Sequence, residues 1–533
     1  MENPAGAGAE GARGAMLPES LRQKDRVTYI LYVYEIVLFS KLLIGGFILF
    51  KEAFMEDVTN FLLPIVQTIN AYMSDYILIF LLVGVGLFYT VRTRFVQIRC
   101  FGEGMKKVFG NIKLRGGKSK GGLSSFQALA TAIAAQVGTG NIVGACGAIL
   151  IGGPGAIFWM WVIAFFGMAT IYAEAVLAQK TKAVQADGSI LGGPVYYIKK
   201  AFKGWFGKFL AGFFAVAITL ALGFMGSMVQ SNSISESIST ASSGYIPTWV
   251  IGIVLAVICA FIFIGGIQRI ASVAEKIVPV MAVLYLLLGI IVLGFNFTKL
   301  PETIGMIFKY AFVPQSLLGG AFGAGIKAAI SQGAKRGLFS NEAGMGSTPH
   351  AHAQANVEKP HDQGVVAMIG VFIDTFVVFT ITALVVISTL YAGNGPLGTQ
   401  AGLAANSAIT KGNMMQTAMG QIFGGTAGSI LIAVCLTFFA FTTIISWNFF
   451  GKLNVQYLFG KKATVVYSVI AIGFILLGSL FPNDLVWELA DMFNNIMVIP
   501  NVLALFVLSS IVVGALKSGK SKKAAKKEAE QTQ

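Results

Sequence analysis

Long apolar runs separated by short polar loops repeat along the chain from residue 27 to residue 515. A helix needs about 20 mostly apolar residues to cross the hydrocarbon core of a membrane. This pattern predicts an all-α polytopic membrane protein with about twelve transmembrane helices. The runs lie at 27–50, 76–94, 122–150, 154–179, 208–235, 248–267, 275–296, 317–356, 364–391, 426–450, 463–481 and 493–515. The stretch 58–73 is short and amphipathic, so we expect it to lie at a membrane interface.

Composition supports this interpretation. Of the 533 residues, 12% are charged and 55% are apolar, whereas soluble domains carry about 25% charged residues. A soluble globular protein, a disordered chain and a nucleic-acid-binding domain are therefore excluded. The four cysteines are far apart in sequence, and we interpret them as small core residues rather than disulfide partners.

The basic residues predict the orientation in the membrane. With Lys335 and Arg336 assigned to a loop, 33 of the 39 Lys and Arg residues fall on one side of the predicted spans and four on the other. Cytoplasmic loops are enriched in Lys and Arg. We therefore expect both termini to be cytoplasmic in a multi-pass protein of the cell membrane, and we interpret the net charge of +15 as a consequence of this orientation.

Two glycine-bearing polar segments interrupt helices. In the first, Gly138, Thr139, Gly140 and Asn141 stand in the middle of the run 122–150. Such a break exposes backbone groups that must find a partner in the hydrocarbon, and a bound solute or ion can be that partner. The alternative is ordinary close packing of helices through small residues.

The second segment contains Asn341, Glu342, Gly344 and Gly346. Its position relative to the following span corresponds roughly to that of the first break, as expected for the two halves of a transporter. A cytoplasmic loop is the alternative interpretation. A competing break at 319–323 fits this correspondence less well.

Three further polar features lie inside apolar spans. Asp374 is an intramembrane acid, which by default indicates function, although a structural ion pair or a protonated acid is the alternative. Thr442, Thr443 and Ser446 offer hydroxyl ligands suited to sodium, or they bond back to carbonyls of their own helix. Gln230 could bond a polar solute or simply join helices.

Three histidines, His350, His352 and His361, cluster near a predicted cytoplasmic helix end. A metal site needs a larger and closed ligand set. We therefore expect no metal ion other than sodium, and no cofactor.

Several of these motifs resemble those of the alanine-or-glycine:cation symporter family. The resemblance covers roughly residues 58–515, and the string NEAGMGS at 341–347 is highly specific. The matching segments are 89–95, 124–129, 137–141, 228–232, 336–347, 372–375 and 441–444.

The resemblance implies a LeuT-type architecture of five helices followed by five of inverted topology, preceded by extra N-terminal helices. The expected organisation is a disordered N-terminus (1–26), an extra helix (27–57), an interfacial and a preceding helix with a basic loop (58–121), a first repeat (122–296), a second repeat (297–515) and a basic tail (516–533). The helix at 27–50 has no counterpart in the family pattern.

The resemblance also implies roles for particular residues. Substrate would be bound by Gly138, Thr139, Gly140, Asn141, Gln230 and Trp447. Sodium would be bound by Ala134, Val137, Asn141, Thr442, Thr443 and Asp374. Asn341, Glu342, Gly344 and Gly346 would form the second broken helix and act in gating.

The function expected from this resemblance is sodium-coupled symport of small neutral amino acids, alanine or glycine, into the cell. The expected partners are the amino-acid substrate and membrane lipids, with no nucleic acid, and the expected oligomeric state is a monomer. The first alternative is a transporter of the same fold that carries another solute or uses protons, with Asp374 as the relay. A channel is disfavoured because no ring of like charges is readable. An enzyme is disfavoured because no nucleophile–base pair appears.

Overall fold

The computed structural model describes residues 56–110, 123–186, 189–313 and 322–519. The chain divides into two compact units, Met1–Leu62 and Leu63–Gln533. In the first unit the described residues are helical. The predicted disordered segment 1–26, the predicted helix 27–50 and most of the basic tail lie outside the described residues.

The described part is built almost entirely of helices, with one small antiparallel sheet in which Ala183 pairs with Leu191. In chain order the elements are η1 (Met73–Leu78), α2 (Ile79–Arg92), α3 (Val96–Arg99), α4 (Phe101–Phe109), α5 (Ser125–Gln136), η2 (Gly140–Gly144), α6 (Ala145–Gly152), α7 (Ala156–Thr181), β1 (Ala183–Val184), β2 (Ile190–Leu191), α8 (Pro194–Ala201), α9 (Gly204–Ile218), η3 (Thr219–Gly226), α10 (Ser227–Ala241), α11 (Thr248–Ile264), α12 (Gly266–Phe295), η4 (Phe297–Lys299), α13 (Leu300–Phe312), α14 (Phe322–Asn341), α15 (Pro349–Gln354), α16 (Pro360–Val371), η6 (Phe372–Phe379), α17 (Thr380–Leu390), α18 (Gln400–Ala405), α19 (Met414–Phe423), α20 (Gly425–Phe459), α21 (Ala463–Gly478) and α22 (Asn483–Val507).

Several of these helices are long and apolar enough to cross a membrane. Among the described residues, seven helical segments meet that requirement, and a bent pair would make an eighth. Two shorter apolar helices, α11 and α21, accompany them. The protein is thus a multi-pass, mostly helical membrane protein, as its hydrophobic pattern predicts.

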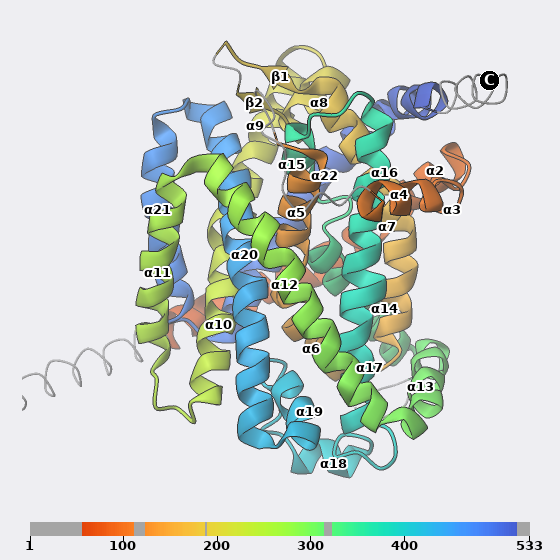
Figure 1. The fold of residues 1–533 in the computed structure, drawn as a ribbon, viewed down its shortest axis with the longest axis vertical. Helices are drawn as coiled ribbons and strands as arrows, with labels where there is room; N and C mark the ends of the chain where they lie inside the picture. The colour runs from red at the N-terminus through yellow and green to blue at the C-terminus, as the bar shows by residue number, and fades with distance from the viewer. Residues whose placement is uncertain (1–55, 111–122, 187–188, 314–321, 520–533) are drawn as a thin grey trace, which may run out of the picture. The chain divides into compact units, whose positions relative to one another are not determined.

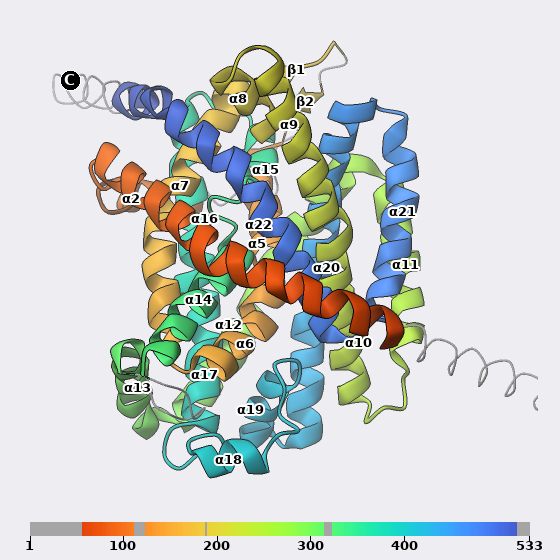
Figure 2. The ribbon, with the colours of Figure 1, turned by 180° about the vertical axis from the view of Figure 1, so that it is seen from behind.

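Within the second unit, the helices form a bundle with α20 running through it (Figure 1). The pair α11 and α21 lies along one edge, and α7, α14 and α16 pack together on the other side. Figure 2 shows α2 and α22 side by side on the back of the bundle. We call the end that carries β1, β2 and α8 the sheet end; α18 and α19 lie at the opposite end.

Both predicted helix breaks are present. α5 and α6 are separated by a short non-helical stretch and a π-helical turn, and their axes differ by 47°. α14 ends at Asn341, and residues 342–348 are not helical before α15 begins. In each pair one half lies toward the sheet end and the other toward the opposite end (Figure 1). The competing break at 319–323 falls mostly outside the described residues.

The stretch 58–73 is not a separate helix, because one helical segment runs over Glu56–Arg92. Its place at a membrane interface stays a prediction. Polar residues that suggested an interface are instead bonded to α22. Asn70 donates to the carboxylate of Glu488 at 2.6 Å, and Asn495 donates to Ser74 at 2.8 Å. These contacts satisfy the polar groups inside the bundle, so the helix has no reason to end there.

The assignment of Lys335 and Arg336 to a cytoplasmic loop is also wrong, because both residues lie inside α14. Arg336 is only 7% exposed. Likewise α22 begins at Asn483, ten residues before the predicted span 493–515. The ten residues that the prediction left out of α22 include the acidic residues Asp484, Glu488 and Asp491.

Candidate functional site

The first break lies between α5 and α6 and is completely buried. Ser124 begins α5 with a capping box, in which its hydroxyl accepts from the Gln127 backbone and its own backbone donates to the Gln127 side chain. The helix ends at Val137, whose ψ of 87° is not helical. A Cβ on Gly138 would lie 2.5 Å from Thr443 Oγ1, so the approach of α20 requires glycine here.

Two carbonyls of α5 lose their usual helical partners at this break. In a regular helix the Ala134 carbonyl would accept from the Gly138 amide, but that amide donates to Asn141 Oδ1 at 3.1 Å. The Val137 carbonyl would accept from the Asn141 amide, which donates to the Gly138 carbonyl at 3.2 Å instead. Both carbonyls are therefore available to another partner.

Thr443 of α20 faces these two carbonyls. Its hydroxyl oxygen lies 2.8 Å from the Ala134 carbonyl oxygen and 3.5 Å from that of Val137. It also lies 3.0 Å from the Phe439 carbonyl oxygen in its own helix. The three predicted residues Ala134, Val137 and Thr443 thus bring neutral oxygen atoms together, a set that suits a hard cation.

Thr442 is not brought to these carbonyls. Its hydroxyl donates to the Phe439 carbonyl at 2.9 Å and lies 3.6 Å from the sulfur of Met281 in α12. The back-bonding alternative therefore describes Thr442. The neighbouring threonines point in different directions because successive helical residues are rotated by about 100°.

Asn141 connects the first break to the acid predicted inside a span. Its side-chain amide donates to Asp374 Oδ1 at 2.7 Å. Asp374 is completely buried in the π-helical segment η6, and its Oδ2 accepts from Ser340 and Thr375, each at 2.9 Å. Carboxylate, amide and hydroxyl groups from three parts of the chain converge here.

Gln230 of α10 lies on the other side of the first break. Its side-chain oxygen accepts from the Thr139 backbone amide at 3.1 Å. Within the described chain, Gln230 Nε2 and Thr139 Oγ1 are buried without a hydrogen-bond partner. Buried polar groups are rarely left unpaired, so these two atoms indicate a site that a polar ligand can fill.

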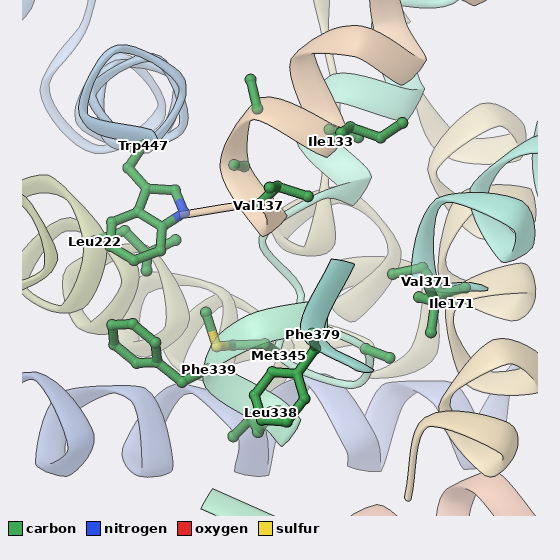
Figure 3. Close-up of a cluster of buried hydrophobic side chains, with 14 of the residues drawn as sticks. Ile133, Val137, Ile171, Leu222, Leu338, Phe339, Met345, Val371, Phe379 and Trp447 are labelled. Atoms are coloured by element: carbon green, nitrogen blue, oxygen red, sulfur yellow. The ribbon is translucent and has the colours of Figure 1, made fainter. Parts of the chain in front are cut away.

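Trp447 joins α20 to the second break. Its indole nitrogen donates to Glu342 Oε1 at 2.5 Å, and its ring packs edge-on against Phe339 with the centroids 5.7 Å apart. A Cβ on Gly226 would lie 2.5 Å from the indole ring. In the view of Figure 3, Trp447 and Phe339 lie to one side of Val137, and Ile171 and Val371 to the other.

The second break is held by side chains from other helices. Glu342 has a left-handed φ of 58°, and its Oε2 accepts from the hydroxyl of Ser347. Gly344 and Gly346 have φ values of 89° and 84°, which side chains rarely adopt. The Gly344 amide donates to Glu174 Oε2 at 3.1 Å. The predicted second break therefore has a backbone that needs its glycines.

Asn341, the remaining residue predicted here, also bridges helices. Its carbonyl accepts from Gln136 at 2.7 Å, and its side chain donates to Thr375 at 3.2 Å. Through Asn341 the end of α5 contacts the end of α14. The two breaks are thus bonded to each other.

Some residues of the site were missed from the sequence. Glu174 is completely buried in α7 and accepts from Asn501 at 2.6 Å. Its position within the apolar span 154–179 was a usable signal, because an acid inside a span is rarely without function. Among the described residues, no cationic side chain is paired with Glu174, Glu342 or Asp374.

The second missed feature is a buried ion pair beside the second break. Arg336 of α14 makes two contacts with Asp491 of α22, at 2.9 and 3.3 Å. The guanidinium also lies 4.8 Å from the ring centroid of Trp487. Phe339 packs between Trp487 and Trp447, with ring centroids 4.8 and 5.7 Å away. This layer covers the first break, where Gly140 faces Phe339.

The three histidines are not one cluster. His350 contacts Asn454 at 2.8 Å, and His352 contacts Gln363 at 2.8 Å. His361 contacts Tyr172 at 2.7 Å. Each ring therefore has a different neighbour.

A cavity of about 870 Å³ opens at the sheet end, between the start of α5 and helices α11, α20 and α21. Gln354 and Lys452 are among its lining residues, but Gly138, Gln230 and Trp447 are not. The candidate site at the breaks is therefore closed off from this cavity.

Comparison with known proteins places the chain in a family. The model of the sodium:alanine symporter family matches residues 59–533. The chain is 40% identical over 457 residues to the sodium/alanine symporter AgcS of Methanococcus maripaludis, covering 85% of this chain and 96% of that protein. It is 39% identical over 469 residues to the probable sodium/glutamine symporter GlnT of Bacillus subtilis, covering 87% and 92% of the two chains.

A crystal structure of MhsT in complex with L-phenylalanine has a similar fold, with a TM-score of 0.52 and 16% sequence identity. The similarity covers 75% of this chain and 98% of that one. It shows that the chain shares the fold of LeuT-type transporters. The family consists of transporters and not enzymes, as expected. On the match over residues 59–533 and these close relatives, the chain belongs to the sodium:alanine symporter family.

Proposed function

We propose that this transporter carries small neutral amino acids, alanine or glycine, into the cell together with sodium. The observation that carries the proposal is the pair of carbonyls at Ala134 and Val137, which the break frees and which face the hydroxyl of Thr443. Sodium prefers hard oxygen ligands, by the same reasoning that applies to other hard cations. This set links α5 to α20, so a bound ion would stabilise one arrangement of the two helices.

The amino-acid substrate would lie at the same break. Its carboxylate would face the start of η2 and α6, where backbone amides and the helix dipole favour an anion. Thr139 Oγ1 and Gln230 Nε2 are buried donors that have no partner among the described residues, and they would complete its hydrogen bonds. Asn141 would contact both the substrate and the ion.

Size selection would come from the packing around Trp447. Phe339 lies against its ring, and Gly226 is the residue that leaves space for the ring to sit where it does. A closed and tightly packed site favours a small side chain. The relative named as a probable glutamine symporter makes glutamine the larger substrate to be tested against alanine.

Asp374 would complete a second cation-binding group with Asn141 and Ser340. Three neutral donors contact its carboxylate, and a buried carboxylate without a cationic partner is costly. A bound sodium ion or a proton would remove that cost. This favours one alternative function, proton-coupled transport with Asp374 as the relay.

The paired breaks support an organisation into two inverted repeats, 122–296 and 297–515. Each repeat would begin with a broken helix, α5 with α6 in the first and α14 with α15 in the second. The sheet end would be cytoplasmic because Lys and Arg residues are concentrated in its loops. Both termini would then be cytoplasmic, and the protein would lie in the cell membrane.

The experiment is uptake of radiolabelled alanine by the purified protein in proteoliposomes. An inward sodium gradient should drive accumulation, and replacing sodium by potassium should abolish it. Uptake that follows a pH gradient and ignores sodium would favour the proton-coupled alternative. Competition by unlabelled glycine and glutamine would then rank the substrates, and no uptake of any of the three would contradict the proposal.

A further inference from the structure

Away from the two breaks, three potential metal ligands meet near the sheet end of the bundle. They are the thiol of Cys100, a carboxylate oxygen of Glu103 and an imidazole nitrogen of His361, all within 4.8 Å of one another. Cys100 joins α3 to α4, and Glu103 follows three residues later on the same helical face. His361 lies in the first turn of α16, which packs against α4.

His361 supplies the second, independent observation. The ring is 1% exposed, and within the described chain its Nε2 makes no hydrogen bond. That nitrogen faces Glu103, 3.5 Å from Oε2. A fully buried imidazole nitrogen that makes no hydrogen bond within the described chain needs a closer partner, and a metal ion between it and the Glu103 carboxylate can be one.

The other nitrogen of His361 is already held. Nδ1 lies 2.7 Å from the hydroxyl of Tyr172 in α7. Histidines that bind metals usually have such a partner on the second nitrogen, which fixes the tautomer and the orientation of the ring. When Nδ1–H donates to the Tyr172 hydroxyl, the lone pair of Nε2 points to the cluster and can bind a metal ion.

The chemistry of this ligand set points to a particular class of ion. Thiolate and imidazole select zinc and similar metals, whereas sodium and magnesium prefer oxygen ligands. Ligand atoms around a tetrahedral zinc ion lie about 3.3–3.8 Å apart. The distances between the three ligand atoms of this cluster would therefore shorten by about 1 Å when an ion binds. The side chain of Glu103 is 14% exposed and gives an ion a way in.

We propose that Cys100, Glu103 and His361 bind one zinc ion, with water as the fourth ligand. On binding, the Cys100 thiol loses its proton to solvent and its sulfur bonds to the metal. The ion would join the segment α3–α4 to α16, and through Tyr172 to α7. Because α16 continues into η6, which contains Asp374, occupancy of this site would restrain the helix that contributes an acid to the transport site.

Gly519, the last described residue, also lies beside this cluster. A Cβ on Gly519 would lie 2.5 Å from the His361 ring, so the last described residues cover the imidazole. This cover excludes bulk water from one side of the ligands. A zinc ion here would therefore be held at a junction of four segments rather than on an open surface.

The test is titration of the full-length, chelator-treated protein with cobalt, which replaces zinc and gives a thiolate-to-cobalt absorption band. The wild type should bind one cobalt per chain, and Cys100→Ser should abolish the band. Cys259→Ser is the matched control, because Cys259 is buried like Cys100 but belongs to no ligand group among the described residues. The Cys259→Ser variant should bind cobalt as the wild type does.

Two further variants keep the test decisive if Cys100→Ser does not fold. Glu103→Gln changes a partly exposed ligand and should weaken binding by at least about tenfold. Tyr172→Phe leaves all three ligands in place and should weaken binding by about 10–100-fold, through loss of the bond to Nδ1. Zinc should raise the midpoint of thermal unfolding of the wild type but not of Cys100→Ser. A wild type without the band, or a band unchanged in Cys100→Ser and Glu103→Gln, would overturn the proposal.

Discussion

The indole nitrogen of Trp447 donates a hydrogen bond to Glu342 Oε1 at 2.5 Å, which ties the middle of α20 to the second helix break. α20 also contacts the first break through Thr443. The bond to Glu342 therefore connects the two breaks through this one helix. Any movement of α20 relative to α14 must break this bond or carry Glu342 along.

Trp447→Phe keeps most of the ring volume but removes the donor. The carboxylate oxygen of Glu342 would then be buried without this partner, at a cost of about 1–3 kcal/mol. We therefore expect a lower midpoint of thermal unfolding. Because about 1.4 kcal/mol corresponds to a factor of ten, we also expect alanine uptake to fall by at least about tenfold. Trp205→Phe is the control, because Trp205 is 76% exposed; equal losses in both variants would contradict the role of the bond.

Thr443→Val removes the hydroxyl that faces the Ala134 carbonyl while keeping the shape of the side chain. A hydrogen bond or ligand contact to a charged group contributes about 1.5–3 kcal/mol. The sodium concentration for half-maximal uptake should therefore rise about 10–100-fold. Thr437→Val on the same helix is the control, since within the described part of the chain the Thr437 hydroxyl bonds to the Ala433 carbonyl of its own helix. An unchanged sodium dependence would refute the ion site.

Gln230→Leu tests the substrate site. The change removes both the acceptor for the Thr139 amide and the buried amide donor. We expect the KM for alanine to rise by about tenfold or more, with a smaller change in sodium dependence. Ser231→Ala serves as the control, because the neighbouring Ser231 bonds to the Ile475 carbonyl and faces α21. If Ser231→Ala raises the KM for alanine as much as Gln230→Leu does, Gln230 does not contact the substrate directly.

Gly226→Ala tests the space that the indole ring occupies. The new methyl group would lie 2.5–2.6 Å from two ring carbons of Trp447, so the ring must move. Overpacking of this kind costs about 1–3 kcal/mol. Alanine uptake should fall, whereas Gly212→Ala should leave uptake unchanged because no atom of the described chain lies within 4 Å of its new Cβ. Alanine uptake is measured for Gly226→Ala and Gly212→Ala at matched expression levels, and only the first variant should show a loss.

The buried ion pair between Arg336 and Asp491 should behave differently from the more exposed pair between Lys411 and Asp484. Removing one partner of a buried pair costs about 3–5 kcal/mol, whereas exposed pairs contribute about 0–1 kcal/mol. We expect Arg336→Met to lower the midpoint of thermal unfolding strongly, and Arg336→Met with Asp491→Leu to recover most of it. Lys411→Ala should have little effect. No recovery in the double variant would show that Arg336 acts through Trp487 instead.

Hydrophobic length and glycine placement predicted the helices and both breaks, because each depends on local sequence. The identity of the sodium ligands was less predictable. Thr442 and Thr443 are equivalent in sequence, and the rotation of α20 against α5 decides which one faces the freed carbonyls. That rotation is set by packing between helices that are distant in sequence.

The charged residues were predicted least well. Arg336 was counted with the basic residues of a cytoplasmic loop, and its partner Asp491 lies 155 positions away. Glu174 was overlooked although it stands in an apolar run. In both cases the stabilising partner comes from another helix, and no local pattern reveals it.

The π-helical segments have a consequence for reading such sequences. Segments η2, η3 and η6 each contain or immediately precede polar residues of the site. A π-turn accommodates one residue more than an α-turn, so the residues that follow are displaced by about 100° from the face that regular periodicity assigns to them. Deleting one residue from η6 would restore regular winding and turn the whole of α17 relative to Asp374. Each segment thus changes which side of the helix faces the site, and it does so without ending the helix.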